Sequence, residues 1–251
     1  MSEKISRRKI ITAGLATAAG VSGLAAKIAD RYGLLAPDSG RVFGAGEALT
    51  YGAQRLLMSH HSMAREFNRS EMSRQTTVNH EHPDDDDYEG FLERHFSDWR
   101  LVVEGLVARP SSFSLEDLKG MPSRSQITML TCEEGWSFIA EWIGVPLAHV
   151  LSLVFPNSGA KWVVFYPFDD FWGSIDMPEA LHPQTLLSYG MNGKDLSPDH
   201  GAPIRLRIPR QLGYKNLKFL NRISVTDDIK KIGDGNGSAA PEIGYSWYAG
   251  I

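Results

Sequence analysis

The residues best suited to chemistry surround the only cysteine of this 251-residue chain. Cys132 stands in the run Thr131-Cys132-Glu133-Glu134-Gly135-Trp136-Ser137. A lone thiol cannot form an internal disulfide, so its use must be packing, nucleophilic chemistry or metal ligation. An inert buried cysteine is the default for an arbitrary position. Here, however, the thiol lies between an apolar run and an acidic, aromatic segment, which suits a strand end that opens into a site.

A second group of chemically capable side chains follows later in the chain. It begins with the run His200-Gly201-Ala202-Pro203-Ile204-Arg205 and continues to Lys215 and Lys218. Three permanent cations and an imidazole would then lie along one strand–loop–strand, with glycines that allow close approach to the backbone. Charge-assisted donors and uncovered amides are what a phosphate group needs. The alternative is a solvated basic face, which the charge content alone would favour.

Together the two groups resemble the motifs of the sulfite oxidase-like molybdopterin enzymes. The bacterial, methionine sulfoxide reductase-like branch carries Cys-x-Glu-x-Trp-Ser and then Trp-x-Gly-x-Pro-Leu, which residues 132–137 and 142–147 match. The family also carries His-Gly-x-Pro-x-Arg, followed by Pro, Gly and Lys at set spacings. That motif is matched by His200, Gly201, Pro203, Arg205, Pro209, Gly213 and Lys218. The resemblance spans about residues 66–228.

The resemblance implies a molybdenum–molybdopterin cofactor and candidate residues to hold it. Cys132 would be the one protein ligand to molybdenum, since soft thiolate sulfur suits a metal already held by the dithiolene sulfurs of the pterin. The molybdopterin would be bound by His200, Arg205, Asn216, Leu217 and Lys218.

An upstream Asn-x-aromatic-Glu run of the family corresponds to residues 68–71, which adds Asn68, Ser70 and Glu71 as cofactor-binding candidates. Ser70 replaces the family's aromatic residue. A threonine that the bacterial branch uses falls at Pro167, so that contact is lost or is supplied by Asp169 or Asp170.

The acids that follow the cysteine bear on the substrate. Sulfite oxidases carry an arginine just past the ligand cysteine, where this chain has Glu133 and Glu134. A carboxylate there would repel a sulfite dianion and suits a neutral or cationic substrate. The expected activity is therefore reduction of an S-oxide or N-oxide, with methionine sulfoxide as the family precedent. Glu134 could donate a proton, with its pKa raised by burial, or could be an exposed turn acid.

Electron transfer and other activities remain open at this stage. The chain has no Cys-x-x-Cys-His motif for haem, so electrons would come from a membrane haem or another exported carrier. A sulfite oxidase-like dehydrogenase or a non-catalytic binding protein could share the same fold. A cysteine-nucleophile hydrolase would need a histidine base, for which His95 and His149 are nearest in sequence. The net charge of −4 argues against a general nucleic-acid binder.

The elements that must position these residues are mostly short strands. Apolar and alternating runs predict strands at 99–107, 126–131, 161–166, 174–177, 204–209 and 217–225. Asn192-Gly193 predicts a hairpin turn between strands at 186–190 and 194–196. Short helices are expected at 114–118 and 147–154. The pattern indicates an α+β fold with a mixed, β-rich core and short helices, as in the sulfite oxidase-type molybdopterin-binding fold.

The N-terminus has a different character. Ser6-Arg7-Arg8-Lys9-Ile10-Ile11 and the Ala/Gly-rich run after it match a twin-arginine export signal. Residues 1–36 are therefore expected to be a leader, and the protein is expected to be periplasmic or membrane-associated. Residues 99–230 would form the oxidoreductase domain, and residues 231–251 a C-terminal tail.

Residues 37–98 are expected to form an extended segment. Gly40, Gly44 and Gly46 suggest a linker, and the four-aspartate run 84–87 is typical of a solvated loop. The nearby histidines His60, His61, His80 and His82 lack zinc-site spacing, so no metal site is expected here.

Overall fold

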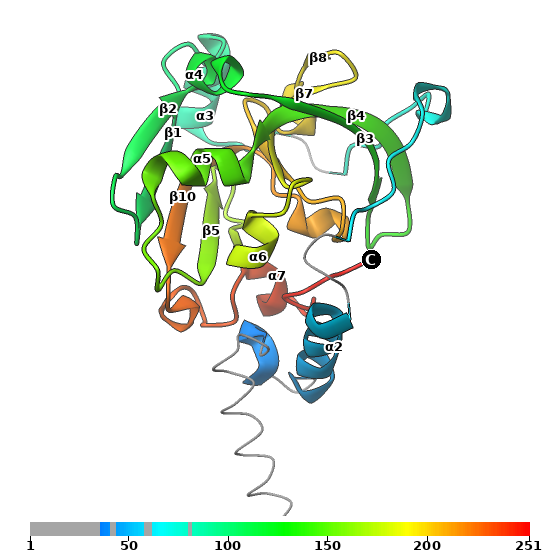
Figure 1. Ribbon diagram of the computed structural model, residues 1–251. Coiled ribbons are helices and arrows are strands. Elements are labelled where there is room, and N and C mark those ends of the chain that lie inside the picture. The colour runs from blue at the N-terminus through cyan, green and yellow to red at the C-terminus, as the bar shows by residue number, and fades with distance from the viewer. Residues whose placement is uncertain (1–35, 41–43, 58–61, 80–81) are drawn as a thin grey trace, which may run out of the picture.

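The strands of the computed structural model, which describes residues 36–40, 44–57, 62–79 and 82–251, form two sheets (Figure 1). The first sheet has the order β2–β1–β10–β5–β6, with strands at Ser111–Ser114, Arg100–Gly105, Leu220–Thr226, Trp162–Pro167 and Gly173–Asp176. β1 pairs with β10 in parallel, whereas the other neighbours are antiparallel. A parallel pair needs a long connection, and this connection contains the whole second sheet.

The second sheet carries the cysteine. Strands β3 (Arg124–Thr131) and β4 (Ser137–Pro146) form a long antiparallel hairpin that arches over one side of the molecule (Figure 1). Strand β7 (Leu186–Met191) pairs with β4, with β8 (Lys194–Asp195) and with β9 (Arg205–Arg207). The hairpin turn after β3 and the short strand β9 are therefore built into one sheet.

Short helices connect the strands. The α-helices described after residue 100 are α4 (Leu115–Gly120), α5 (Leu147–Val154), α6 (Met177–Ala180) and α7 (Ala239–Glu242). Ser114 and Asp117 form a capping box at α4, which satisfies two backbone donors that the first turn leaves without partners. Single 3₁₀ turns lie at Pro37–Gly40, Arg69–Glu71, Pro198–His200, Gly213–Lys215 and Ile229–Lys231.

The expectation of a solvated loop at residues 84–87 is wrong in part, because only residues 84 and 85 lie outside a helix. The aspartates start helix α3 (Asp86–Glu93), and Asp85 is its N-cap, with its carboxylate accepting a hydrogen bond from the Tyr88 backbone N–H at 2.8 Å. Asp86 and Asp87 lie in the first turn, where negative charge interacts favourably with the helix dipole. The helix also buries Tyr88 completely.

The linker expected at residues 40–46 is also wrong in part, because helix α2 (Gly44–Leu57) begins at the second of its glycines. The helix is fastened to the body of the molecule. The Tyr51 hydroxyl donates to Asp176 at 2.7 Å, and Arg55 forms an ion pair with the same carboxylate at 2.6 Å. Tertiary contacts of this kind stabilise a helix more than local propensity does.

The main hydrophobic core draws on both sheets. It includes fully buried Leu101 and Ile223 from the first sheet and Trp142 from the second. A second cluster joins α2 to the C-terminal segment through Tyr51, Trp247 and Tyr248. No helix among the described residues is long and apolar enough to cross a membrane. Residues 1–35 of the predicted leader and the histidines at 60, 61 and 80 lie outside the described residues, whereas Ala36 is buried in the second cluster.

The strand-rich α+β fold is confirmed, and two strands are displaced from their predicted bounds. The strand predicted at 204–209 is only Arg205–Arg207, and both faces are buried, so its arginines form no solvated face. The strand predicted at 217–225 is observed at Leu220–Thr226. Its start is delayed because Phe219 has a positive φ of 54° and Leu217 bonds to Leu206 instead.

Candidate active site

Cys132 lies in the tight turn between β3 and β4. Its backbone N–H donates to the Trp136 carbonyl at 2.9 Å, and its carbonyl accepts from Gly135 at 3.1 Å. Gly135 has a φ of +92°, which few side-chain-bearing residues tolerate. The cysteine side chain is only 4% exposed. The predicted strand end that opens into a site is therefore confirmed as a hairpin turn with an inward-facing thiol.

Two carboxylates lie next to the thiol. Cys132 Sγ donates to Glu133 at 3.2 Å and lies 3.8 Å from Glu134. Burial, together with the two neighbouring acids, raises the pKa of the Cys132 thiol to about 12. A bound metal cation would offset this rise in pKa, because a thiol that coordinates a metal loses its proton outright. Without such a cation the thiol stays protonated at neutral pH.

The thiol shares a small pocket with three of the predicted cofactor-binding residues. Its walls include Cys132, Trp136, His200, Arg205, Lys218, Gly213 and Asn79. A wider cleft of about 540 Å³ adjoins it, lined among others by Arg205, Gly213, Lys218, Asn216 and Leu217. The two sequence motifs, which are far apart in the chain, thus meet at one site.

Two cations and an imidazole shape this pocket. Arg205 donates to the carbonyls of His200 and Asn216, both at 2.9 Å. Burial lowers the pKa of Arg205 to about 10 and that of Lys218 to about 8. His200 Nδ1 contacts Ser197 at 2.9 Å, but its buried Nε2 has no hydrogen-bond partner within the described part of the chain. The site therefore offers positive charge and an unused polar atom to an anionic ligand.

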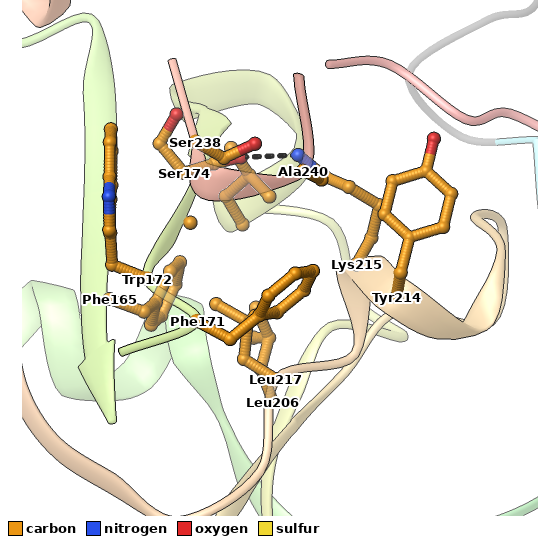
Figure 2. A pocket seen from close by; sticks show the side chains of 12 residues that line it. Phe165, Phe171, Trp172, Ser174, Leu206, Tyr214, Lys215, Leu217, Ser238 and Ala240 are labelled. Atoms are coloured by element: carbon orange, nitrogen blue, oxygen red, sulfur yellow. Dashed lines mark hydrogen bonds between the residues drawn. The ribbon is translucent and has the colours of Figure 1, made fainter. Parts of the chain in front are cut away.

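The third predicted cation, Lys215, does not join the other two. It is buried in a separate small chamber behind the cleft, where its Nζ donates to the Ser174 carbonyl at 2.8 Å (Figure 2). The ammonium also lies over the Trp247 ring, 4.9 Å from its centroid. The 3₁₀ turn Gly213–Lys215 directs this side chain away from Lys218. The phosphate-binding interpretation therefore keeps Arg205 and Lys218 only.

The candidates Asn68, Ser70 and Glu71 line neither the pocket nor the cleft. They form an exposed 3₁₀ turn in which Glu71 accepts from Asn68, both from its backbone N–H and from its side chain. The same segment instead brings Asn79 to both cavities. No local pattern predicts Asn79 as a site residue, because the run around it has no periodicity and reaches the site only by crossing the β3–β4 hairpin.

Three further features belong to the site, and only the Tyr214–Tyr245 pair has no counterpart in the sequence prediction. Gly213 lies so close to the cysteine that a Cβ atom there would approach Cys132 Cα to 3.3 Å. Tyr214 stacks on Tyr245, with ring centroids 5.0 Å apart, and both line the cleft. Asp169 and Asp170, which were considered as replacements for the missing threonine, also line it.

Residues 89–231 match the model of the oxidoreductase molybdopterin binding domain. The matched part is more than half of the chain. The chain belongs to this molybdopterin-binding oxidoreductase family. The family assignment agrees with the geometry, in which a soft sulfur donor, two cations and an unpartnered imidazole nitrogen surround one pocket. Thiolate sulfur suits molybdenum, and the cations suit the anionic phosphate of the pterin.

Similar proteins fall in the same family. This chain is 40% identical over 152 residues to a putative protein-methionine-sulfoxide reductase subunit YedZ1 from Azospira oryzae, covering 61% of this chain and 56% of that protein. It is 35% identical to the protein-methionine-sulfoxide reductase catalytic subunit MsrP from Ralstonia nicotianae, covering 56% of this chain and 46% of that protein. The chain thus spans about half the length of the curated relatives it matches.

A solved structure shows the same fold. The sulfane dehydrogenase SoxCD from Paracoccus pantotrophus matches with a TM-score of 0.50 and 26% sequence identity, over 52% of this chain and 39% of that one. The sulfite oxidase-type molybdopterin-binding fold expected from the sequence is therefore confirmed, and so is the family with its molybdenum–molybdopterin cofactor.

Proposed function

We propose that this protein is an exported molybdopterin-dependent oxidoreductase that reduces S-oxides or N-oxides, with methionine sulfoxide as the leading substrate. One observation carries the proposal: the candidate metal ligand Cys132 lies beside two carboxylates in a pocket whose other wall is cationic. The relatives named as methionine-sulfoxide reductases support the substrate class.

The cofactor would be held from two sides. Cys132 provides the metal ligand, while Arg205 and Lys218 provide charge-assisted donors to the phosphate. His200 Nε2 and the exposed Asn79 side chain add polar contacts from the pocket wall. When bound, the cofactor supplies two-electron oxygen-atom chemistry. The chain's own residues bind it, orient it and leave the cleft open to a substrate.

The acids select a neutral or cationic substrate. Glu133 and Glu134 lie on the thiol side of the pocket, and Asp169 and Asp170 line the cleft. Negative charge at these positions repels a sulfite dianion. A sulfoxide is neutral, and its small polar head could enter between the acids and the aromatic wall that Tyr214 forms.

Reduction of a sulfoxide needs two electrons and two protons, and it yields a thioether and water. The S–O bond breaks, sulfur is reduced, and a membrane haem or another exported electron carrier is oxidised. We assign proton delivery to Glu133 in place of the predicted Glu134. Glu133 is partly buried, lines the cleft and contacts the thiol, whereas Glu134 is exposed and accepts a hydrogen bond from Trp136 Nε1 at 2.7 Å.

An assay of both reaction directions tests this proposal. Protein purified after native export, reduced by a viologen dye, is expected to reduce methionine sulfoxide. Glu133→Gln is expected to lower kcat about 10²-fold or more, the usual contribution of a positioned acid, with its molybdenum content unchanged. Glu134→Gln is the matched control and should change kcat little. Faster oxidation of sulfite than reduction of any sulfoxide would refute the substrate assignment.

Export by the twin-arginine route belongs to the same proposal. That route carries folded proteins, so it suits an enzyme that must acquire its cofactor before it leaves the cytoplasm. The Ser6-Arg7-Arg8-Lys9 run supports it. Replacement of Arg7 and Arg8 by lysine is expected to retain the protein in the cytoplasm, as measured by cell fractionation; unchanged export would contradict this route.

A further inference from the structure

Arg207 is a fully buried arginine whose hydrogen bonds all go to neutral groups. Its Nη1 donates to Asn216 Oδ1 at 2.8 Å, and its Nη2 donates to the Thr128 hydroxyl at 3.0 Å and the Met129 carbonyl at 2.6 Å. The guanidinium also lies over the Trp142 ring, 5.1 Å from its centroid. No ion pair to Arg207 is present among the described residues.

Such a side chain is costly to bury. Burial, followed by the charge of nearby Arg205, lowers the pKa of Arg207 well below its ordinary value. A hydrophobic side chain of similar length would fill the space without that penalty. What an apolar residue or a lysine cannot supply is the planar fork of donors, which reaches several fixed acceptors at once.

The acceptors of Arg207 belong to the two halves of the active site. Thr128 and Met129 lie on β3, a few residues before Cys132. Asn216 belongs to the segment 211–218, here named the cofactor loop. The Asn216 side chain closes this loop by donating to the carbonyls of Gln211 and Leu212 at 3.3 and 2.9 Å.

The two halves need accurate spacing. The cofactor loop passes so close to the cysteine that even a methyl group on Gly213 would crowd Cys132 Cα and the Thr131 carbonyl. The loop also provides Lys218 to the pocket wall, and the Asn216 carbonyl fixes Arg205. A shift of the loop against β3 would therefore separate the thiol from the phosphate-binding cations.

We propose that Arg207 is a positioning residue that clamps the Cys132 strand to the cofactor loop, so that the thiolate and the cations engage one and the same cofactor. Arg207 itself lines neither the pocket nor the cleft, and it acts through Thr128 and Asn216. The inference rests on the cofactor assignment above but not on the identity of the substrate.

The test compares Arg207→Met, which removes the charge and the fork, with Arg207→Lys, which keeps only the charge. Arg100→Met is the matched control, because Arg100 is a strand arginine whose partners in the described part of the chain, Ser112 and Asp117, line neither the pocket nor the cleft. Each full-length protein is purified after native export. Its pterin and molybdenum per chain, its melting temperature and the electron paramagnetic resonance spectrum of its molybdenum are then measured.

The pterin content per chain of Arg207→Met is expected to be about 10-fold or more below that of the wild type, the usual effect of removing a group that orients a metal ligand. Its loaded fraction is expected to give an altered molybdenum spectrum, which a loss of stability alone would not produce. Arg207→Lys should show the same spectral change, since an ammonium cannot reach all three acceptors. Arg100→Met should match the wild type in both measurements.

Two outcomes would overturn the inference. One is wild-type pterin content and an unchanged spectrum in folded Arg207→Met. If Arg207→Met does not fold, Thr128→Val decides, because it deletes one of the three acceptors without a change of shape; an unchanged spectrum there refutes the clamp. Wild-type protein that contains pterin but reduces no S-oxide refutes the proposed function alone. Wild-type protein without pterin refutes both.

Discussion

At the scale of single residues, two side chains that are close together in the sequence lie in different cavities of the structure. Lys215 and Lys218 are three positions apart, yet Lys218 lines the cofactor pocket whereas Lys215 is buried at a second small pocket that adjoins the cleft. Among the residues that the structure describes, a carbonyl and an aromatic ring are the groups that contact its ammonium directly. Burial therefore lowers the pKa of Lys215 to about 7, although Asp38, Asp176 and Glu179 partly oppose this effect.

Lys215 gives the free energy of unfolding a pH dependence. Its folded pKa of about 7 lies below the ordinary value of 10.5, so between these pH values the unfolded chain binds more protons. Stability should thus rise from pH 7 to 10.5 and be lost as the pH falls back, by up to about 1.4 kcal/mol per pH unit. In urea unfolding, Lys215→Met should flatten this slope, whereas exposed Lys230→Met should not. Equal slopes in all three proteins would contradict the assignment.

At the scale of elements, the four-aspartate run shows how a local pattern can be misread. The run looks like a solvated loop by composition, but its second residue caps α3 and its last two occupy the first turn. The missed signal is the spacing from Asp85 to Tyr88. A capping residue three positions before a residue that the core buries completely indicates the start of a helix. Acidity at the start of a helix is favourable.

Removal of this cap should destabilise the protein. Asp85→Ala is expected to lower the free energy of unfolding by about 1 kcal/mol, because the Tyr88 N–H loses its acceptor. Asp84→Ala is the matched control, since Asp84 is an exposed neighbour outside the helix, and it should change stability by much less. Thermal denaturation measures both. Equal effects of the two substitutions would show that net charge, and not capping, is responsible.

Most strands and the helices α4 and α5 were predictable, whereas strands β2 and β4 were not predicted. A period of two in hydrophobicity and a strong Asn-Gly turn are local signals, and they placed β1, β3, β5 and β7 within a few residues of their observed bounds. The position of residues 66–79 was not predictable. That segment reaches β3 and β4 through single contacts such as the Glu66–Thr128 bridge and the Ser73–Ile139 hydrogen bond, which no local pattern encodes. Asn79 was therefore missed as a site residue.

At the scale of the whole molecule, segments from both ends of the described chain support the site. Near the C-terminus, Gly250 forms a β-bridge with Gln211, and the Ala249 carbonyl accepts a hydrogen bond from Leu212, both in the cofactor loop. Helix α2 packs on the same C-terminal segment through Tyr51 and Trp247. The cationic pocket therefore lies inside a continuous packed body, and filling it should stabilise the entire fold.

Inorganic phosphate should act as a partial substitute for the cofactor. At ten times its Kd it is expected to raise the free energy of unfolding of cofactor-free protein by about 1.4 kcal/mol, because it binds the folded state alone. Arg205→Met should abolish this gain, since the pocket then keeps only the Lys218 cation. Chloride at equal ionic strength is the control. A gain that is the same in wild type and variant would place phosphate elsewhere on the surface.

The central claim is that Cys132 is the protein ligand to molybdenum, and metal analysis of Cys132→Ser tests it most directly. Both proteins are purified after native export from cells that make the pterin, and circular dichroism confirms that each is folded. The wild type should contain about one molybdenum per chain, as expected for a single thiolate site, and Cys132→Ser should lose both the metal and the activity. A variant that keeps its molybdenum and its turnover would contradict the account.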